Sequence, residues 1–249
     1  MREVRLLFTG PLMRITDVIC RASCGAGRDD EHNEVPELVV PRRGVFIVQR
    51  GRRKIVADPT TAVVLRDEYR VSHPAYGGDR CLALALPPEL VEEALGGAWV
   101  LRAPQRLTIG YGLGLLEAEE QAMGFLAHLA GAPRLRVSPR VEQVRQLLAA
   151  HLGQRWTLGG IARAVHISPY HLARQFRAAT GQTIAQYLTG LRLAAALDRI
   201  QAGEDDLARV AADLGFASHS HLTERFRHGY GVTPSQVRKI LTARSSRAR

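Results

Sequence analysis

A stretch of thirteen residues occurs twice in the second half of this chain, fifty residues apart, and this repeat constrains the fold more than any other feature. The first copy runs from His171 to Thr183 and the second from His221 to Thr233, with six of the thirteen positions identical. A short apolar segment precedes each copy: Ile161, Ala162 and Val165, then Val210, Ala211 and Leu214, forty-nine residues apart. The second copy therefore has one extra residue in its turn. One supersecondary unit is therefore present twice.

Each unit is predicted to be two helices joined by a tight turn. The first unit has a helix over residues 158–165 and a second helix that begins after the cap Ser168, with a proline in its first turn. The second unit has a helix over residues 207–214 and another that begins near Ser218. In each second helix, an apolar pair spaced four residues apart marks the buried face. These pairs are Leu172 with Phe176 and Leu222 with Phe226.

The opposite face of each second helix is predicted to be exposed and to contact DNA. Side chains near the start of such a helix reach base edges in a major groove, and basic residues on its flanks meet phosphates. Arg174 is the strongest candidate for a guanine contact. The full candidate set is Tyr170, Ala173, Arg174, Arg177, His219, Ser220, Thr223, Glu224 and Arg227.

The segment between the units and the charge of the region both suit this interpretation. The apolar pattern from Ile184 to Leu197 describes one helix of about 17 residues, roughly 25 Å long, which can hold two recognition helices about one DNA turn apart. The chain has a net charge of +10. Residues 134–249 hold 18 Lys and Arg against 7 Asp and Glu, whereas residues 1–133 are nearly neutral. A solvated basic face is the alternative, but the duplication favours a polyanionic partner.

Two segments of the second unit are the most specific: Val210-Ala-Ala-Asp-Leu-Gly-Phe216 and Thr233-Pro-Ser-Gln-Val-Arg238. With these segments, residues 161–238 resemble the C-terminal DNA-binding domain of the AraC/XylS family of transcription regulators. The resemblance implies base contacts by Tyr170, Ala173 and Arg174 from the first unit, and by His219, Ser220, Thr223 and Glu224 from the second. It further implies double-stranded DNA and RNA polymerase as partners, and an N-terminal cupin-like barrel that senses a ligand or mediates dimerisation.

The sequence departs from the family pattern in two places. Gly159 and Gly160 weaken the opening helix of the first unit by about 1 kcal/mol each. Glu224 stands where a polar or basic base-reader is common, so the second unit either favours a cytosine amino group or discriminates against other sites.

The first half of the chain reads as short strands separated by turns, which suggests a small barrel or sandwich. An acidic loop is expected over residues 29–37. Helices are expected from Pro88 to Leu95 and from Leu113 to Leu129, the latter packing on the barrel or on a second subunit. The expected strands are Met13–Ala22, Glu37–Val40, Val45–Val48, Lys54–Ala57, Ala62–Leu65 and Arg80–Leu86.

The expected architecture is thus α+β with two domains, divided at a linker over residues 130–134. Residues 1–132 form a cupin-like sensory or dimerisation barrel with flanking helices. Residues 133–249 form an all-α domain, in which a linker helix joins two helix-turn-helix units. The function we expect is an effector-responsive, sequence-specific activator that reads two successive major-groove segments. A homodimer is a further expectation, and no residue is singled out for the effector.

Other chemistry has weaker signals. Cys20, Cys24, Cys81 and His73 are candidates for a soft-metal or thiol sensor, with buried cysteines acting as small hydrophobes as the alternative. Metal cupins use several histidines, but this half has no close His-x-His pair. A zinc-dependent repair methyltransferase needs a cysteine cluster that three cysteines do not supply. We therefore expect no enzyme and no cofactor.

The same features bear on location. Three cysteines are too few for a disulfide framework, which agrees with the reducing cytoplasm. Every apolar run is interrupted before the roughly 18 to 20 residues that a membrane helix needs.

Overall fold

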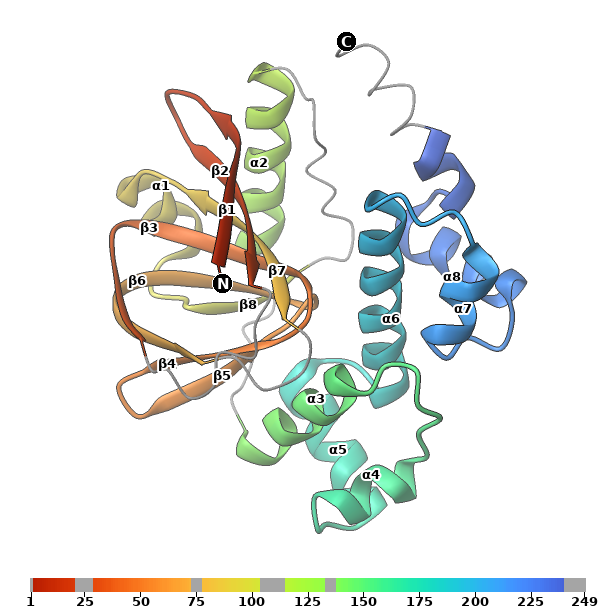
Figure 1. The fold of residues 1–249 in the computed structure, drawn as a ribbon. Coiled ribbons are helices and arrows are strands. Elements are labelled where there is room, and N and C mark those ends of the chain that lie inside the picture. The colour runs from red at the N-terminus through yellow and green to blue at the C-terminus, as the bar shows by residue number, and fades with distance from the viewer. Residues whose placement is uncertain (1, 21–28, 73–77, 104–114, 133–137, 240–249) are drawn as a thin grey trace.

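The computed structural model describes residues 2–20, 29–72, 78–103, 115–132 and 138–239 (Figure 1). An N-terminal sheet with two helices is followed by a group of helices (Figure 1). The strands are β1 (Arg2–Thr9), β2 (Arg14–Cys20), β3 (Asp29–Arg43), β4 (Phe46–Arg50), β5 (Arg53–Ala57), β6 (Thr61–Ser72), β7 (Asp79–Ala85) and β8 (Val100–Arg102).

The eight strands form one antiparallel sheet in the order β1-β2-β7-β3-β6-β4-β5, with β8 paired to β6. Within the described residues β1 and β5 do not pair, so the sheet is open and the expected closed barrel is wrong. The physical reason lies at the β5 edge, which α3 (Pro139–Ala150) covers. There the backbone N–H of Val56 donates to the carboxylate of Glu142 over 2.5 Å. This bond satisfies a donor of the edge strand without another strand.

All six expected strands are present, with changed boundaries. The expected acidic loop over residues 29–37 belongs instead to β3, whose backbone pairs with β6. Strands β1 and β8 were not expected. Along β1 most residues are exposed, including Val4 and Leu6, so the strand lacks the alternation that a half-buried strand shows.

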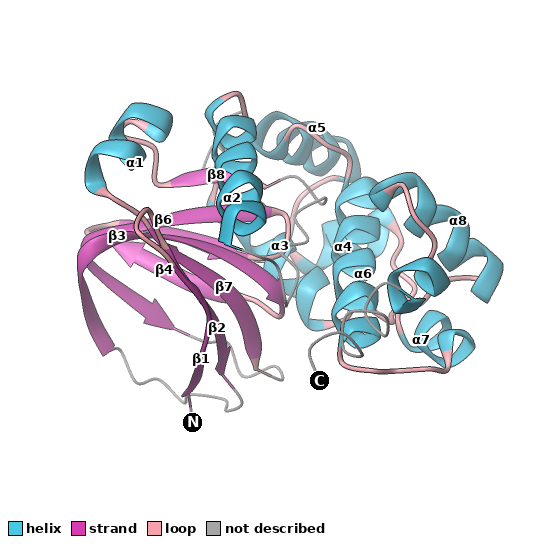
Figure 2. Cartoon of the chain, turned by 90° about the horizontal axis from the view of Figure 1, so that it is seen from above, coloured by secondary structure: helices cyan, strands magenta, loops and turns pink. Residues whose placement is uncertain are grey.

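One face of the sheet is covered by α1 (Pro88–Leu95) and α2 (Leu115–Ala130) (Figure 2). Ile15 and Leu38 from the sheet share a core with Phe125 and Leu129 of α2. The apolar stripe of α2 therefore packs on the sheet of the same chain and not on a second subunit, which was the other packing that the sequence allowed. A second core, around Val48, lies on the other face.

The C-terminal helices match the predicted order. They are α3, α4 (Leu158–Ala164), α5 (Pro169–Thr180), α6 (Ile184–Gln201), α7 (Leu207–Asp213) and α8 (His219–Tyr230), and residues 234–239 are also helical. The predicted caps of α5 and α8 are confirmed, because the side chains of Ser168 and Ser218 each accept a hydrogen bond from a backbone N–H in the first turn of their helix. Ser138, before α3, makes no such bond. No helix within the described part of the chain is long and apolar enough to cross a membrane.

Candidate nucleic-acid interface

The second helix of the first unit, α5, buries one face and exposes the other. Leu172 and Phe176 are fully buried, and the ring of Phe176 packs edge-on against Tyr187 of α6 at 5.2 Å between centroids. The predicted facing of the helix is therefore confirmed. On the opposite side Tyr170 is 72% exposed, and Ala173, Arg174 and Arg177 are exposed as well.

The second unit repeats this arrangement in α8. Leu222 and Phe226 are fully buried, and Phe226 packs against Tyr230 with ring centroids 4.6 Å apart. The candidate residues lie on the other side: His219, Ser220, Glu224 and Arg227 are exposed and Thr223 is half-exposed. Each set of candidate residues thus forms a face on one helix.

The turn between the two helices of each unit contains a residue in the left-handed region. It is His166 in the first unit, with φ 53°, and Gly215 in the second, with φ 73°. A β-carbon at Gly215 would lie 2.6 Å from the guanidinium of Arg192. A glycine is therefore needed here both for the positive φ and for the lack of room for a side chain. The glycines of the first unit's opening helix do not prevent α4 from forming, since Thr157 caps it by accepting from the Gly160 N–H.

Arg192 of α6 ties the two units together. Its guanidinium donates to the carbonyl oxygens of Leu152 and Gln154 before α4, at 2.8 and 2.9 Å, and to that of Gly215 in the second turn at 2.9 Å. Partial burial lowers the pKa of Arg192. Because two of these carbonyls lie just before the first unit and the third lies in the turn of the second, Arg192 connects the two units in addition to α6.

The connector and the clefts beside it suit an extended ligand. α6 has 18 residues, which corresponds to about 27 Å. The exposed face of α5 borders a cleft of about 530 Å³ that Tyr170, Arg174 and Arg177 help to line. The exposed face of α8 borders another, of about 820 Å³, in which Glu224 is the one acidic lining residue.

Comparison with known proteins identifies this region. A helix-turn-helix domain model matches residues 161–240. An AraC-like protein of Streptomyces antibioticus is 31% identical over 127 residues, which cover 51% of this chain and 40% of that protein. The regulatory protein SoxS of Escherichia coli is 31% identical over 91 residues, 36% of this chain but 85% of SoxS. This chain belongs to the AraC family of transcriptional regulators.

The similarity to longer members of the AraC family is partial, since the chain spans about two-fifths of the Streptomyces protein. Among solved structures, the DNA-binding domain of AdpA in complex with a target DNA is 26% identical to it, with a TM-score of 0.41. That alignment covers 43% of this chain and 96% of the AdpA domain.

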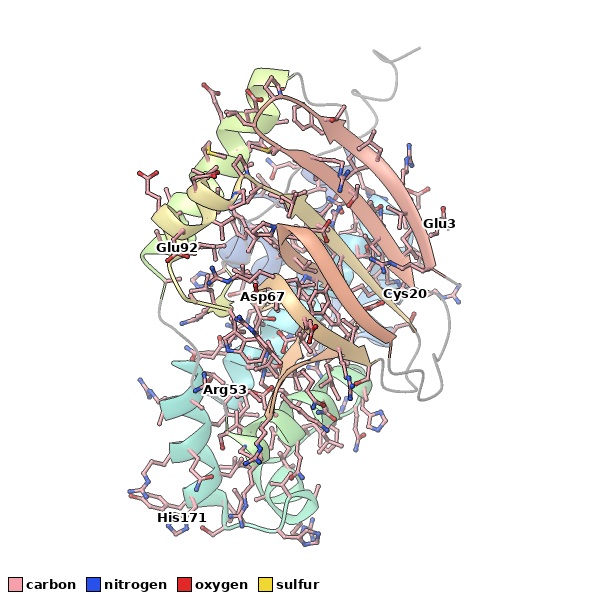
Figure 3. The ribbon with its side chains drawn as sticks, turned by 90° about the vertical axis from the view of Figure 1, so that its left-hand side faces the viewer. Glu3, Cys20, Arg53, Asp67, Glu92 and His171 are labelled. Atoms are coloured by element: carbon pink, nitrogen blue, oxygen red, sulfur yellow. The ribbon has the colours of Figure 1, made fainter. Side chains whose placement is uncertain are left out.

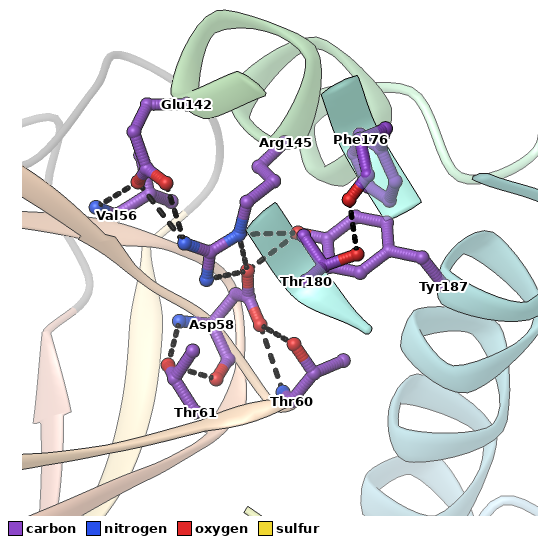
Figure 4. Close-up of polar contacts among 9 residues, drawn as sticks. All are labelled: Val56, Asp58, Thr60, Thr61, Glu142, Arg145, Phe176, Thr180 and Tyr187. Carbon is purple, nitrogen blue, oxygen red and sulfur yellow. Dashed lines mark hydrogen bonds and ion pairs between the residues drawn. The ribbon is translucent and has the colours of Figure 1, made fainter. Parts of the chain in front are cut away.

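A buried polar cluster joins the sheet of this AraC-family chain to α3 and α6, which pack against the first unit (Figure 4). Asp58, in the turn between β5 and β6, accepts hydrogen bonds from Arg145 of α3 at 2.6 and 3.0 Å and from the Tyr187 hydroxyl at 2.5 Å. Arg145 also pairs with Glu142 at 2.9 Å. These four residues, Asp58, Glu142, Arg145 and Tyr187, form what we call the interface cluster.

Burial and neighbouring charges shift the pKa of two members of the interface cluster, Arg145 and Tyr187. Burial disfavours the charged guanidinium of Arg145, but Asp58 and Glu142 outweigh this effect and raise its pKa. Burial and the negative charge of Asp58 raise the pKa of Tyr187, so its hydroxyl stays protonated and donates. A second contact lies farther along α6, where Asp198 pairs with Arg80 of β7 at 3.0 Å.

The cysteine sensor candidates are only partly placed. Cys24 and His73 lie outside the described residues. Cys20 is half-buried, pairs with Arg2 of β1, and lies away from His171 of α5 (Figure 3). Cys81 is buried, and burial followed by the charge of Asp79 raises the pKa of its thiol, the opposite of what a reactive cysteine needs. Within the described part of the chain, no group of three or more His, Cys, Asp or Glu residues can hold a metal.

Proposed function

We propose that this chain binds a specific site on double-stranded DNA through α5 and α8 and regulates transcription there. The observation that carries the proposal is the repeated pair of helices, each with a buried Leu-Phe pair and an exposed polar face, held on one rigid connector. One chain then reads two successive major-groove segments, because a connector of about 27 Å approaches the roughly 34 Å between them.

The proposed base contacts differ between α5 and α8. Arg174 donates to a guanine, and Tyr170 and Ala173 contact neighbouring base edges, with Ala173 suited to a thymine methyl group. In the second unit His219, Ser220 and Thr223 read bases, and Glu224 accepts from a cytosine amino group. Arg177 and Arg227 lie farther along their helices and bind phosphates.

The remaining parts of the proposal concern regulation. We assign residues 1–132 to effector sensing or dimerisation and residues 133–249 to DNA binding. The apolar face of α2 is used inside the chain, which leaves the sheet as the dimerisation surface in a homodimer. Activation through RNA polymerase is the part that rests on the family resemblance alone.

Selection of bound duplexes from a pool of random sequence tests the central proposal. The intact chain should enrich a motif with two conserved blocks whose centres lie about 10 base pairs apart, one block for each helix. A chain that retains duplexes without enriching any sequence would contradict specific binding. Enrichment of a single block would contradict the use of both helices.

A further inference from the structure

A third cleft, which we call the central cleft, lies between the sheet unit and the DNA-binding helices and has a volume of about 1140 Å³. One wall comes from β8 and α2, including Arg102 and His128, and the other from α6 and α8. It shares Ala185 with the cleft beside α5, and Arg225 and His228 with the cleft beside α8. The central cleft therefore adjoins the clefts beside both recognition helices.

The lining of the central cleft is suited to an anion. The described residues that line it include no Asp or Glu, and they present Arg102, His128, Arg225 and His228. Arg102 donates to the side-chain oxygen of Gln182 at 3.3 Å, and among the described residues neither Arg102 nor Arg225 has a carboxylate within ion-pair distance.

Two half-buried arginines elsewhere in the molecule are each neutralised by two carboxylates. Arg80 pairs with Asp17 and Asp198, and Arg199 pairs with Asp213 and Glu204. Arg102 differs from Arg80 and Arg199 in that no carboxylate of the described residues lies within ion-pair distance of it.

The interface cluster fixes Arg102 relative to α6. Arg102 pairs with Thr61 across β8 and β6, and the next residue, Ala103, donates to the Thr60 carbonyl at 2.9 Å. Thr60 and Thr61 both hydrogen-bond to Asp58, which in turn holds Arg145 and Tyr187. A short chain of bonds therefore runs from the core of α6 to the backbone that carries Arg102.

We propose that the sheet unit is a third DNA-contacting surface, in which Arg102, assisted by His128, binds the phosphate backbone between the segments read by α5 and α8. This inference rests on the proposed function. Between two major-groove segments on one face of a duplex, the minor groove and its flanking phosphates turn toward the connector, where the central cleft lies. Phosphate contacts of this kind position the protein without reading sequence.

The test measures binding of the full chain to a duplex of about 30 base pairs, roughly three helical turns, selected from a random pool by the wild-type protein. Affinity is measured across a salt series. Removing one phosphate contact should lower the slope of log K against log salt by about one and leave the preference over random DNA unchanged. Arg102→Ala and Arg102→Gln should both show this loss. The glutamine variant keeps a donor toward Gln182, and Arg102→Lys should retain the wild-type slope because it keeps the charge.

Arg52→Ala is the matched control, because Arg52 is an exposed arginine of the same unit that lines none of the three clefts. Its slope should equal that of the wild type. The inference is overturned if the two uncharged Arg102 variants keep the slope of Arg52→Ala. It is equally overturned if they only weaken binding of inorganic phosphate, since the cleft then takes a small anion. Failure of the wild-type chain to select any duplex would instead refute the proposed function.

Discussion

Replacing Asp58 by alanine should destabilise the protein more than any change to an exposed ion pair. The Asp58 side chain is fully buried and accepts from Arg145, from Tyr187 and from Thr60. Without it Arg145, which is 3% exposed, keeps Glu142 as its one carboxylate, and the Tyr187 hydroxyl loses its acceptor.

The magnitude follows from the burial of the pair. Removing one partner of a buried ion pair costs about 3 to 5 kcal/mol, because the other charge remains without compensation. In a chain of this size each kcal/mol lowers the melting temperature by about 2 to 4 °C, so Asp58→Ala should lower it by roughly 6 to 20 °C. The triple variant Asp58→Ala, Glu142→Gln and Arg145→Met should recover part of that loss, because it removes the buried charges that Asp58→Ala leaves behind.

Thermal unfolding followed by circular dichroism measures these effects. Arg50→Ala is the control, because it breaks the exposed pair of Arg50 with Asp67 and should cost less than about 1 kcal/mol. If Asp58→Ala melts together with Arg50→Ala, the interface cluster does not stabilise the contact between the sheet and the first unit.

Three further variants test separate parts of the structure. Arg174→Ala should weaken binding to a selected site by about 1 to 3 kcal/mol while leaving the fold intact, and an equal loss on random DNA would make Arg174 a phosphate contact. Phe226→Ala should destabilise the second unit by about 3 to 5 kcal/mol, and unchanged melting would show that α8 does not pack through this ring. With Cys20 and Cys24 replaced by alanine, the buried Cys81 thiol should react with dithiodipyridine only after denaturation, and rapid reaction of the native protein would contradict its burial.

The C-terminal half was predictable from sequence because its signals are local. Helix caps at Ser168 and Ser218 and apolar pairs four residues apart act within one or two turns. The facing of α5 and α8 follows from them, and so does the exposure of Arg174 and Glu224. The duplication also made the linker helix predictable, because the segment between two copies of one unit must connect them.

The sheet was less predictable, because its edges depend on distant parts of the chain. β1 exposes most of its residues and pairs along one side only, so neither alternation nor a buried run marks it. Closure of the sheet was expected from the number of strands. The strand count carries no information about α3, whose Glu142 reaches Val56 across 86 positions of sequence and covers the β5 edge.

The interface cluster had no local signal either. In α3 the apolar residues Val141, Val144 and Leu148 lie on the buried face. Glu142 and Arg145 lie beside these residues and resemble an ordinary pair on a solvated helix face. They are buried because Asp58 and Tyr187 approach from segments that no pattern in the sequence connects to α3.

A hydroxyl-radical footprint of the full chain on a selected duplex tests the central claim most directly. We predict two protected segments on one face of the DNA, centred about 10 base pairs or 34 Å apart. Arg174→Ala should weaken the protection of one segment, and the paired change His219→Ala with Glu224→Ala should weaken that of the other. A single protected segment, or loss of the same segment in both variants, would show that this chain does not read DNA through two helix-turn-helix units.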